Sequence, residues 1–219
     1  MPHAPEYTIA DVAFDDEHIL LTLTDGRVLR TFIKRHIRVN EATPEQRRDW
    51  QRNADGTGVN WPRLWRPADE GMVNVWDIEQ DALYNLALGR LHRAGWDLDA
   101  VPQVERELVA LWRMEADINN GGFMQFLCNW GEPSVLLAID ALGLIGAPRT
   151  QECVRGMYEV IRHYGETEEM VALNDLYGMM SEAEHDRMQA LEEAFWDYPE
   201  RLDRAVVLYY APRVTPDPA

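Results

Sequence analysis

The pair Glu182 and His185 comes nearest to a metal-binding arrangement in this chain. A Glu-x-x-His spacing places two ligands on one face of a helix, as in di-iron helical bundles. Such a bundle needs this motif twice, together with two further glutamates, and the sequence holds no second copy. Glu159 and His163 also share a helical face, but ordinary surface pairs have the same spacing. We therefore expect no bound metal and no cofactor.

The two cysteines, Cys128 and Cys153, offer no nucleophilic chemistry. Neither has a histidine in a recognisable catalytic pattern, and no nucleophile elbow is present. Two cysteines give neither a zinc spacing nor a disulfide framework, so we expect free thiols in a reducing compartment. The sequence predicts no catalytic residues, and a protein that works by binding.

The segment Asn119–Phe123, with sequence Asn-Asn-Gly-Gly-Phe, has two interpretations. Glycines allow backbone N–H groups to approach an anion, which would make the segment a ligand loop. Alternatively, Gly121 or Gly122 turns the chain between two helices, and the asparagines bond to free backbone ends. We favour the helix corner, because no lysine follows as in a phosphate loop and the surroundings are acidic.

The distribution of charge is the most informative feature of the sequence. The chain carries a net charge of −17, whereas residues 1–67 hold ten acids and ten bases. Subtracting these from the 38 acids and 21 bases of the whole chain leaves 28 acids and 11 bases for residues 68–219. This excess disfavours nucleic acid and anionic lipid as partners and favours a cationic protein. Salt adaptation would acidify both parts, but a surface kept acidic for solubility is a competing interpretation.

Acids are densest on the helices predicted after residue 150. A helix advances about 6 Å over four residues, and DNA presents a phosphate about every 3.4 Å along each strand, so exposed carboxylates can approximate a row of phosphates. The acids expected to contact a partner are Glu152, Glu159, Glu166, Glu168, Glu169, Asp175, Glu182, Glu184, Asp186, Glu192, Glu193 and Asp197.

The sequence predicts β-strands in the first third of the chain. Alternating apolar residues at Ile19, Leu21 and Leu23, followed by Asp25-Gly26, predict a hairpin with a type I′ turn. A further strand is expected over 8–14, and Thr43-Pro44 predicts a short helix running to about Arg52.

From about Val75 the apolar period becomes helical. Pro133, Pro148 and Pro199 mark helix starts, and Ser181 with Glu184 forms a capping box. These patterns predict an α+β protein, with a small strand-rich α+β module at 1–72, an acidic all-α domain at 73–211 and a flexible tail at 212–219. No signal peptide or membrane span is visible, because the longest apolar stretch, 135–147, is short and contains Asp140. We expect a cytoplasmic protein.

Two stretches resemble known families. The string Ile118-Asn119-Asn120-Gly121-Gly122-Phe123, with Glu115, Gln125, Phe126 and Asn129, resembles the signature of the Neisseria-type DNA-mimic protein family over residues 105–208. The resemblance implies a helical domain, commonly dimeric, whose acidic surface imitates DNA and occupies a DNA-binding protein. Residues 42–48 and 56–62 resemble a small bacterial module of unknown function that is often encoded near toxin–antitoxin-like partners.

Two binding functions follow from these observations. In the first, the acidic helical domain occupies a transcription factor, nucleoid protein or defence protein and competes with DNA, without itself binding nucleic acid or membrane. In the second, an antitoxin- or immunity-type protein neutralises a partner through its N-terminal module, where Trp50, Trp61 and Trp65 would be the anchors. Those tryptophans suit the core of the module, or its seam with the helical domain, better than they suit a role as anchors.

Overall fold

The computed structural model describes residues 6–166 and 173–215. The chain divides into two compact units, Met1–Ala82 and Leu83–Ala219. The expected fold class is confirmed, since a small region with two three-stranded sheets precedes a long helical region. The domain bounds at 72 and 211 stay predictions, and residues 216–219 of the expected tail lie outside the described residues.

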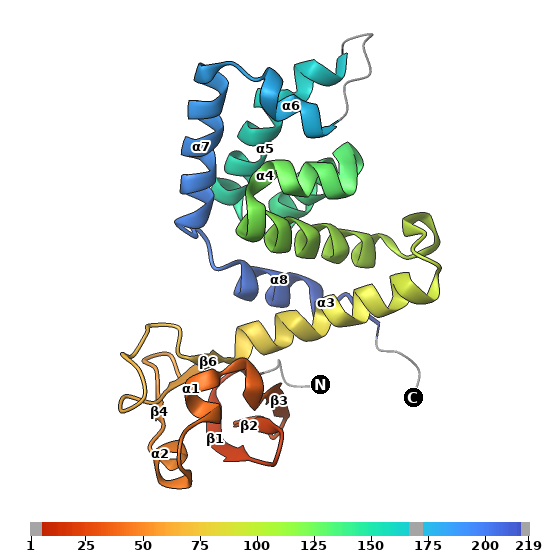
Figure 1. Cartoon of the computed structure of the whole chain (residues 1–219). Helices are drawn as coiled ribbons and strands as arrows, with labels where there is room; N and C mark the ends of the chain where they lie inside the picture. Colours follow the sequence, from red (N-terminus) through yellow and green to blue (C-terminus); the bar gives the residue numbers. More distant parts are fainter. Residues whose placement is uncertain (1–5, 167–172, 216–219) are drawn as a thin grey trace. The chain divides into compact units, whose positions relative to one another are not determined.

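The first unit begins with an antiparallel sheet in the order β1-β2-β3 (Figure 1). Its strands are β1 (Ile9–Phe14), β2 (His18–Leu23) and β3 (Val28–Phe32). Ile19, Leu21 and Leu23 on β2 are almost completely buried, as their alternation in the sequence predicts. One face of this sheet therefore contributes to the core of the unit.

The hairpin between β2 and β3 differs from the predicted turn type. Gly26 has φ +87°, but Asp25 is absent from the described non-glycine residues with positive φ. The Gly26 N–H donates to the Leu23 carbonyl at 3.0 Å, and the Leu23 N–H donates to the Arg27 carbonyl at 2.8 Å. This is the three-residue loop with a bulge, in which only the glycine adopts the left-handed conformation. The Asp25 carboxylate stabilises it by accepting from the Arg27 N–H at 3.0 Å.

The rest of the first unit builds a second sheet, β4-β5-β6. The predicted helix begins at Pro44 behind a Thr43 capping box, but it ends at Arg48, because residues 51 and 52 pair with β5 instead. Trp61 is fully buried, and its indole N–H donates to the Arg47 carbonyl at 2.9 Å, so this tryptophan is a core residue. The remaining elements are η1 (Ile33–Arg35), α1 (Ile37–Asn40), α2 (Pro44–Arg48), β4 (Gln51–Arg52), β5 (Gly58–Asn60) and β6 (Val73–Asn74).

Helices make up the second unit, and α3 runs across the boundary between the units. The elements are α3 (Val75–Arg93), η2 (Leu98–Ala100), α4 (Gln103–Leu144), α5 (Pro148–Ile161), η3 (Arg162–Glu166), α6 (Leu173–Met179), α7 (Glu182–Trp196) and α8 (Leu202–Tyr210). The last helix starts at Leu202 and not at Pro199 as predicted, because Tyr198 and Arg201 have non-helical backbone angles. None of the helices in the described residues is both long and apolar enough to cross a membrane.

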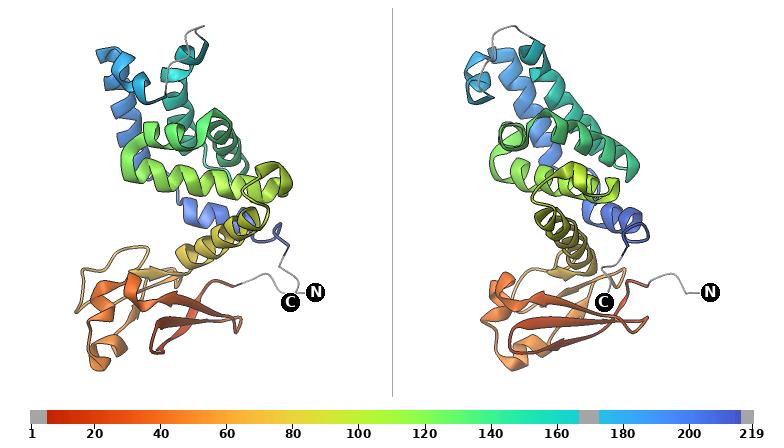
Figure 2. Two further views of the ribbon diagram at one scale, coloured as in Figure 1. Left: turned by 45° about the vertical axis from the view of Figure 1, so that its right-hand side comes forward. Right: turned by 90° about the vertical axis from the view of Figure 1, so that its right-hand side faces the viewer.

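Long helix α4 is broken inside by three glycines. Gly121, Gly122 and Gly131 have non-helical φ and ψ, so the helical pieces run in different directions, as Figure 1 shows. The apolar residues of the pieces, among them Leu108, Leu111 and Phe126, are fully buried in the core of the unit. Helix α5 packs against both α4 and α7, and Figure 2 shows α5 and α7 side by side in two further views. The core holds one face of α7 against the rest of the unit, and the remaining surface of this helix is open to solvent.

Candidate protein-interaction surface

Helix α7 carries three exposed acids on one face, Glu182, Asp186 and Glu193. With 3.6 residues per turn, positions four and eleven residues after Glu182 lie within about 40° of it around the helix axis. The three carboxylates therefore form a line about 16 Å long, which we call the α7 stripe. Gln189 continues the same face, and its amide donates to Glu193 at 2.9 Å.

No cation neutralises the α7 stripe within the described part of the chain. Its three acids form no ion pair there, and the nearest arginine on the same helix, Arg187, lies about 100° or more around the axis from each of them. Exposed carboxylates without countercharges retain their full negative potential and attract a cationic surface from a distance. Among the predicted contact residues whose side chains the structure describes, the stripe is therefore the run whose charge is both aligned and free of ion pairs.

Helix α5, which carries two more of the predicted acids, has a mixed face. Glu152 and Glu159 are exposed there, but Arg155 and Arg162 are exposed on the same side. Arg162 donates to Glu159 at 3.0 Å. Alternating charges of this kind cancel at a distance, so α5 does not extend the row of negative charge.

Two further predicted contact acids serve the fold. Glu184 closes the capping box of α7, where its carboxylate accepts from the Ser181 backbone N–H at 2.8 Å and from the Tyr164 hydroxyl at 2.9 Å. Glu192 is half-buried, and its Oε1 accepts from the Phe123 backbone N–H at 2.7 Å. Asp175 and Asp197 are exposed. Glu168 and Glu169 lie outside the described residues, and the Glu166 side chain is not described.

The Asn-Asn-Gly-Gly-Phe segment forms the first break of α4. Gly122 has φ +81° and ψ 179°, a conformation that essentially only glycine adopts. A Cβ atom at this position would lie 2.5 Å from Glu192 Oε1, and one at Gly121 would lie 2.0 Å from Gln125 Oε1. Gly122 is needed for its backbone angles, and a side chain at either position would have to displace the oxygen of Glu192 or Gln125. The structure contains the helix corner that the sequence favoured. The carboxylate of Glu192 accepts from the backbone N–H of Phe123, which is the group that an anion would bind in a ligand loop.

Two polar residues of the signature, together with Trp130, converge on one carboxylate, that of Asp117. It accepts from Gln125 at 2.9 Å, from Asn129 at 3.1 Å and from the Trp130 indole N–H at 2.6 Å. These bonds join residues on both sides of the break. The asparagines thus bond to side chains, whereas the sequence suggested free backbone ends: Asn120 donates to Gln125 at 3.2 Å.

Two more residues of the signature are placed by tyrosines. Asn119 accepts from the Tyr198 hydroxyl at 3.2 Å, and Glu115 accepts from the Tyr84 hydroxyl at 2.5 Å. Phe123 is fully buried. The signature therefore shapes the corner of α4 and connects it to the end of α7.

Sequence reasoning missed Asp117 and its buried neighbour Arg113. The Arg113 side chain is only 7% exposed, with its guanidinium 3.8 Å from the centre of the Trp130 ring. Burial lowers the pKa of Arg113, and the negative charge of Asp117 opposes that shift. The spacing of Arg113 and Asp117 gave a signal, since oppositely charged residues four apart are neighbours on one helical face, whereas Trp130 reaches Asp117 only across the break in α4.

In the described residues, no group of three or more histidine, cysteine or acidic side chains could hold a metal ion. Glu182 and His185 make no joint contact, and His185 packs against the Tyr177 ring at 4.4 Å. Cys153 is buried and Cys128 half-buried, and burial raises the pKa of both thiols.

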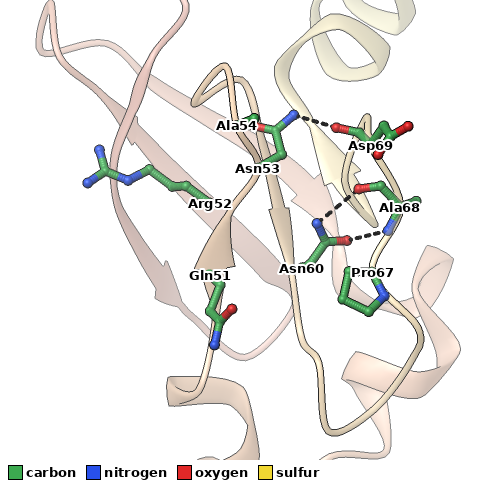
Figure 3. Close-up of a pocket in the computed structure, with 8 residues that line it drawn as sticks. All are labelled: Gln51, Arg52, Asn53, Ala54, Asn60, Pro67, Ala68 and Asp69. Carbon is green, nitrogen blue, oxygen red and sulfur yellow. Dashed lines mark hydrogen bonds between the residues drawn. The ribbon is translucent and has the colours of Figure 1, made fainter.

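A pocket of about 290 Å³ lies in the first unit between β4, β5 and the segment 67–69 (Figure 3). The amide of Asn53 donates to the Asp69 carbonyl at 2.9 Å, and the amide of Asn60 donates to the Ala68 carbonyl at 3.2 Å. These asparagines hold the segment against the sheet. The polar lining of the pocket is thus part of the fold of the unit.

Comparison with protein families bears on both units. The second unit matches the family described as DMP19-like protein over residues 99–212, which is more than half of the chain. The chain belongs to the DMP19-like family of DNA-mimic proteins. The N-terminal part of this DMP19-like protein matches a family described as protein of unknown function (DUF2442) over residues 9–87. Neither family is a family of enzymes. No curated protein and no solved structure matches the chain.

Proposed function

We propose that the α7 stripe of this DMP19-like protein binds the basic surface of a DNA-binding protein and competes there with duplex DNA. The observation that carries the proposal is the alignment of Glu182, Asp186 and Glu193 on one exposed face with no ion pair in the described residues. Membership of a DNA-mimic family supplies the class of partner.

The spacing of the stripe suits this role. Along the α7 axis, its acids are about 6 Å and about 10.5 Å apart, close to two and three phosphate steps of about 6.8 and 10.2 Å on one DNA strand. A cationic surface shaped to hold consecutive phosphates can therefore meet these carboxylates in register. Binding involves no bond made or broken, and its rate should depend strongly on salt, because long-range attraction steers the encounter.

The experiment is a capture from the native cytosol with the full chain as bait. Its variants are E182Q/D186N/E193Q and, as a control with the same change of charge, D140N/E152Q/E159Q, which removes exposed acids of α4 and α5. We expect the wild type and the control to retain a nucleic-acid-binding protein that duplex DNA displaces and moderate salt releases. The stripe variant should retain much less. A captured partner that binds no nucleic acid and resists high salt would refute the proposal.

One observation favours the second candidate function, which is neutralisation of a partner through the N-terminal module. Trp65 is 48% exposed, whereas Trp61 is fully buried and Trp50 half-buried, so only Trp65 offers a large accessible ring. Arg38 already stacks on that ring at 3.5 Å. If W65A abolishes capture and the stripe variant does not, this second function replaces the first.

A further inference from the structure

Two aromatic side chains stand at the C-terminal end of the α7 stripe. Trp196 is 40% exposed and Tyr198 is 66% exposed, on either side of the exposed Asp197. Trp196 follows Glu193 by three residues and lies within about 60° of it around the helix axis. The line of carboxylates on α7 therefore ends in an accessible aromatic surface.

Both rings are held in place by their polar tips. The Trp196 indole N–H donates to the Ile118 carbonyl at 3.3 Å, and the Tyr198 hydroxyl donates to Asn119 at 3.2 Å. These bonds tie the rings to the α4 corner, while both side chains remain exposed. Tyr198 also has φ +48°, which is rare for a bulky residue. Rings fixed before binding lose little conformational entropy when a partner covers them.

Exposed aromatic rings favour arginine over lysine as a bound cation. Arginine has a planar guanidinium that stacks on aromatic faces and binds carboxylates with two parallel hydrogen bonds, whereas lysine presents a compact, strongly hydrated charge. This chain uses the same contact internally, with Arg213 3.9 Å from the centre of the Tyr209 ring. In the described residues no cationic side chain stacks on Trp196 or Tyr198.

We propose that Trp196 and Tyr198 form an arginine-selective anchor beside the α7 stripe, so that the partner presents an arginine-rich segment. This inference rests on the proposed function and names the chemistry of the partner. The stripe supplies a salt-sensitive attraction to any cation, and the two rings add a contact that salt weakens less. Tryptophan, tyrosine and arginine are enriched among the residues that dominate interface energies.

The test compares two peptides of equal length, one of arginines and one of lysines, by titration calorimetry against the full-length protein. We expect the arginine peptide to bind the wild type about threefold or more tightly than the lysine peptide, because an exposed cation–π contact is worth about a factor of two to five per ring and a guanidinium stacks on the ring face better than an ammonium. In W196L/Y198L the ratio of the two affinities should fall several-fold, towards the ratio that the acids of the stripe alone would give. Y198F keeps the ring and should keep most of the preference, and W96L, which removes another exposed indole, should keep all of it.

The outcomes separate the two proposals. If W196L/Y198L keeps its circular dichroism spectrum and the wild-type preference for arginine, the anchor is refuted while the stripe stands. If the double variant fails to fold, W196L alone, which leaves the Tyr198 hydrogen bond intact, is measured in its place. W196L must then lower the preference for the arginine peptide, and an unchanged ratio of the two affinities refutes the anchor. If E182Q/D186N/E193Q binds both peptides as tightly as the wild type, the proposed function itself fails.

Discussion

The backbone N–H of Phe123 donates a 2.7 Å hydrogen bond to Oε1 of Glu192, 69 residues later in the chain. The bond joins the break in α4 to the middle of α7. It gives the N–H at the start of a helical piece an acceptor, where a negative charge is also favoured by the helix dipole. The signature glycines therefore act on the proposed interaction surface indirectly, by fixing the helix that carries the stripe.

Removing this acceptor should destabilise the protein. E192A leaves the part-buried Phe123 N–H without its partner, which should lower the free energy of unfolding by about 1–3 kcal/mol. Urea denaturation followed by circular dichroism measures the change. The adjacent E193A removes an exposed acid and should change the value by less than about 0.5 kcal/mol. Equal effects of the two variants would contradict a structural role for Glu192.

Gly122→Ala should be more damaging than the loss of Glu192. The new Cβ would meet Glu192 Oε1 at 2.5 Å, and alanine is strained at φ +81°. We expect a loss of about 3 kcal/mol in the free energy of unfolding. G178A, where no atom lies within 4 Å of the added Cβ, is the control and should be neutral or slightly stabilising. In G122A/E192A the clash disappears, so the double variant should lose less than the sum of the single variants.

Asp117→Asn should weaken both sides of the α4 break. The substitution removes the charge that three side-chain donors and the buried Arg113 share, and it turns an N–H group towards some of those donors. Because Asp117 is half-buried, we expect a loss of about 2 kcal/mol in the free energy of unfolding. Tryptophan fluorescence and denaturation would show it. A stability equal to that of the wild type would mean that the network contributes nothing.

Glu184 should make the stability of α7 depend on acid pH. Hydrogen bonds from the Ser181 backbone N–H, the Ser181 hydroxyl and the Tyr164 hydroxyl lower the pKa of Glu184 to about 2, from an ordinary value of 4.5. A folded-state pKa below the unfolded value gives stability that is present above pH 4.5 and is lost as the pH falls towards 2. The difference in Tm between the wild type and E184Q should therefore shrink over this range. G178A removes neither a titrating group nor a side-chain hydrogen bond, and its difference from the wild type should stay constant.

The stripe should cost the folded protein a little stability. Glu182 and Asp186 are like charges at i, i+4, so D186N should raise the free energy of unfolding by about 0.3 kcal/mol at low salt and by less at high salt. E152Q on the mixed face of α5 is the matched contrast. Glu152 lies three residues before Arg155, so its neutralisation should lower stability slightly. Urea midpoints at two salt concentrations decide the sign of each effect.

Local sequence patterns predicted much of the fold. Alternation at Ile19, Leu21 and Leu23 predicted a strand with one buried face. Thr43 followed by Pro44, and the capping box at Ser181, marked helix starts correctly. The turn type and the end of α2 could not be predicted in this way. The φ angle of Asp25 depends on the bulge of its loop, and the end of α2 depends on pairing between residues 51–52 and β5.

The sequence by itself determined the excess of acids after residue 67, the α+β order and the glycines of the α4 corner, because charge, periodicity and backbone freedom are properties of short segments. Only the tertiary structure decided which acids are free. Glu192 and Glu184 are engaged by groups that folding brings to them, Glu159 is paired with Arg162, and Glu182, Asp186 and Glu193 remain aligned and unpaired in the described residues. A carboxylate's availability depends on neighbours distant in the chain, which no local pattern records.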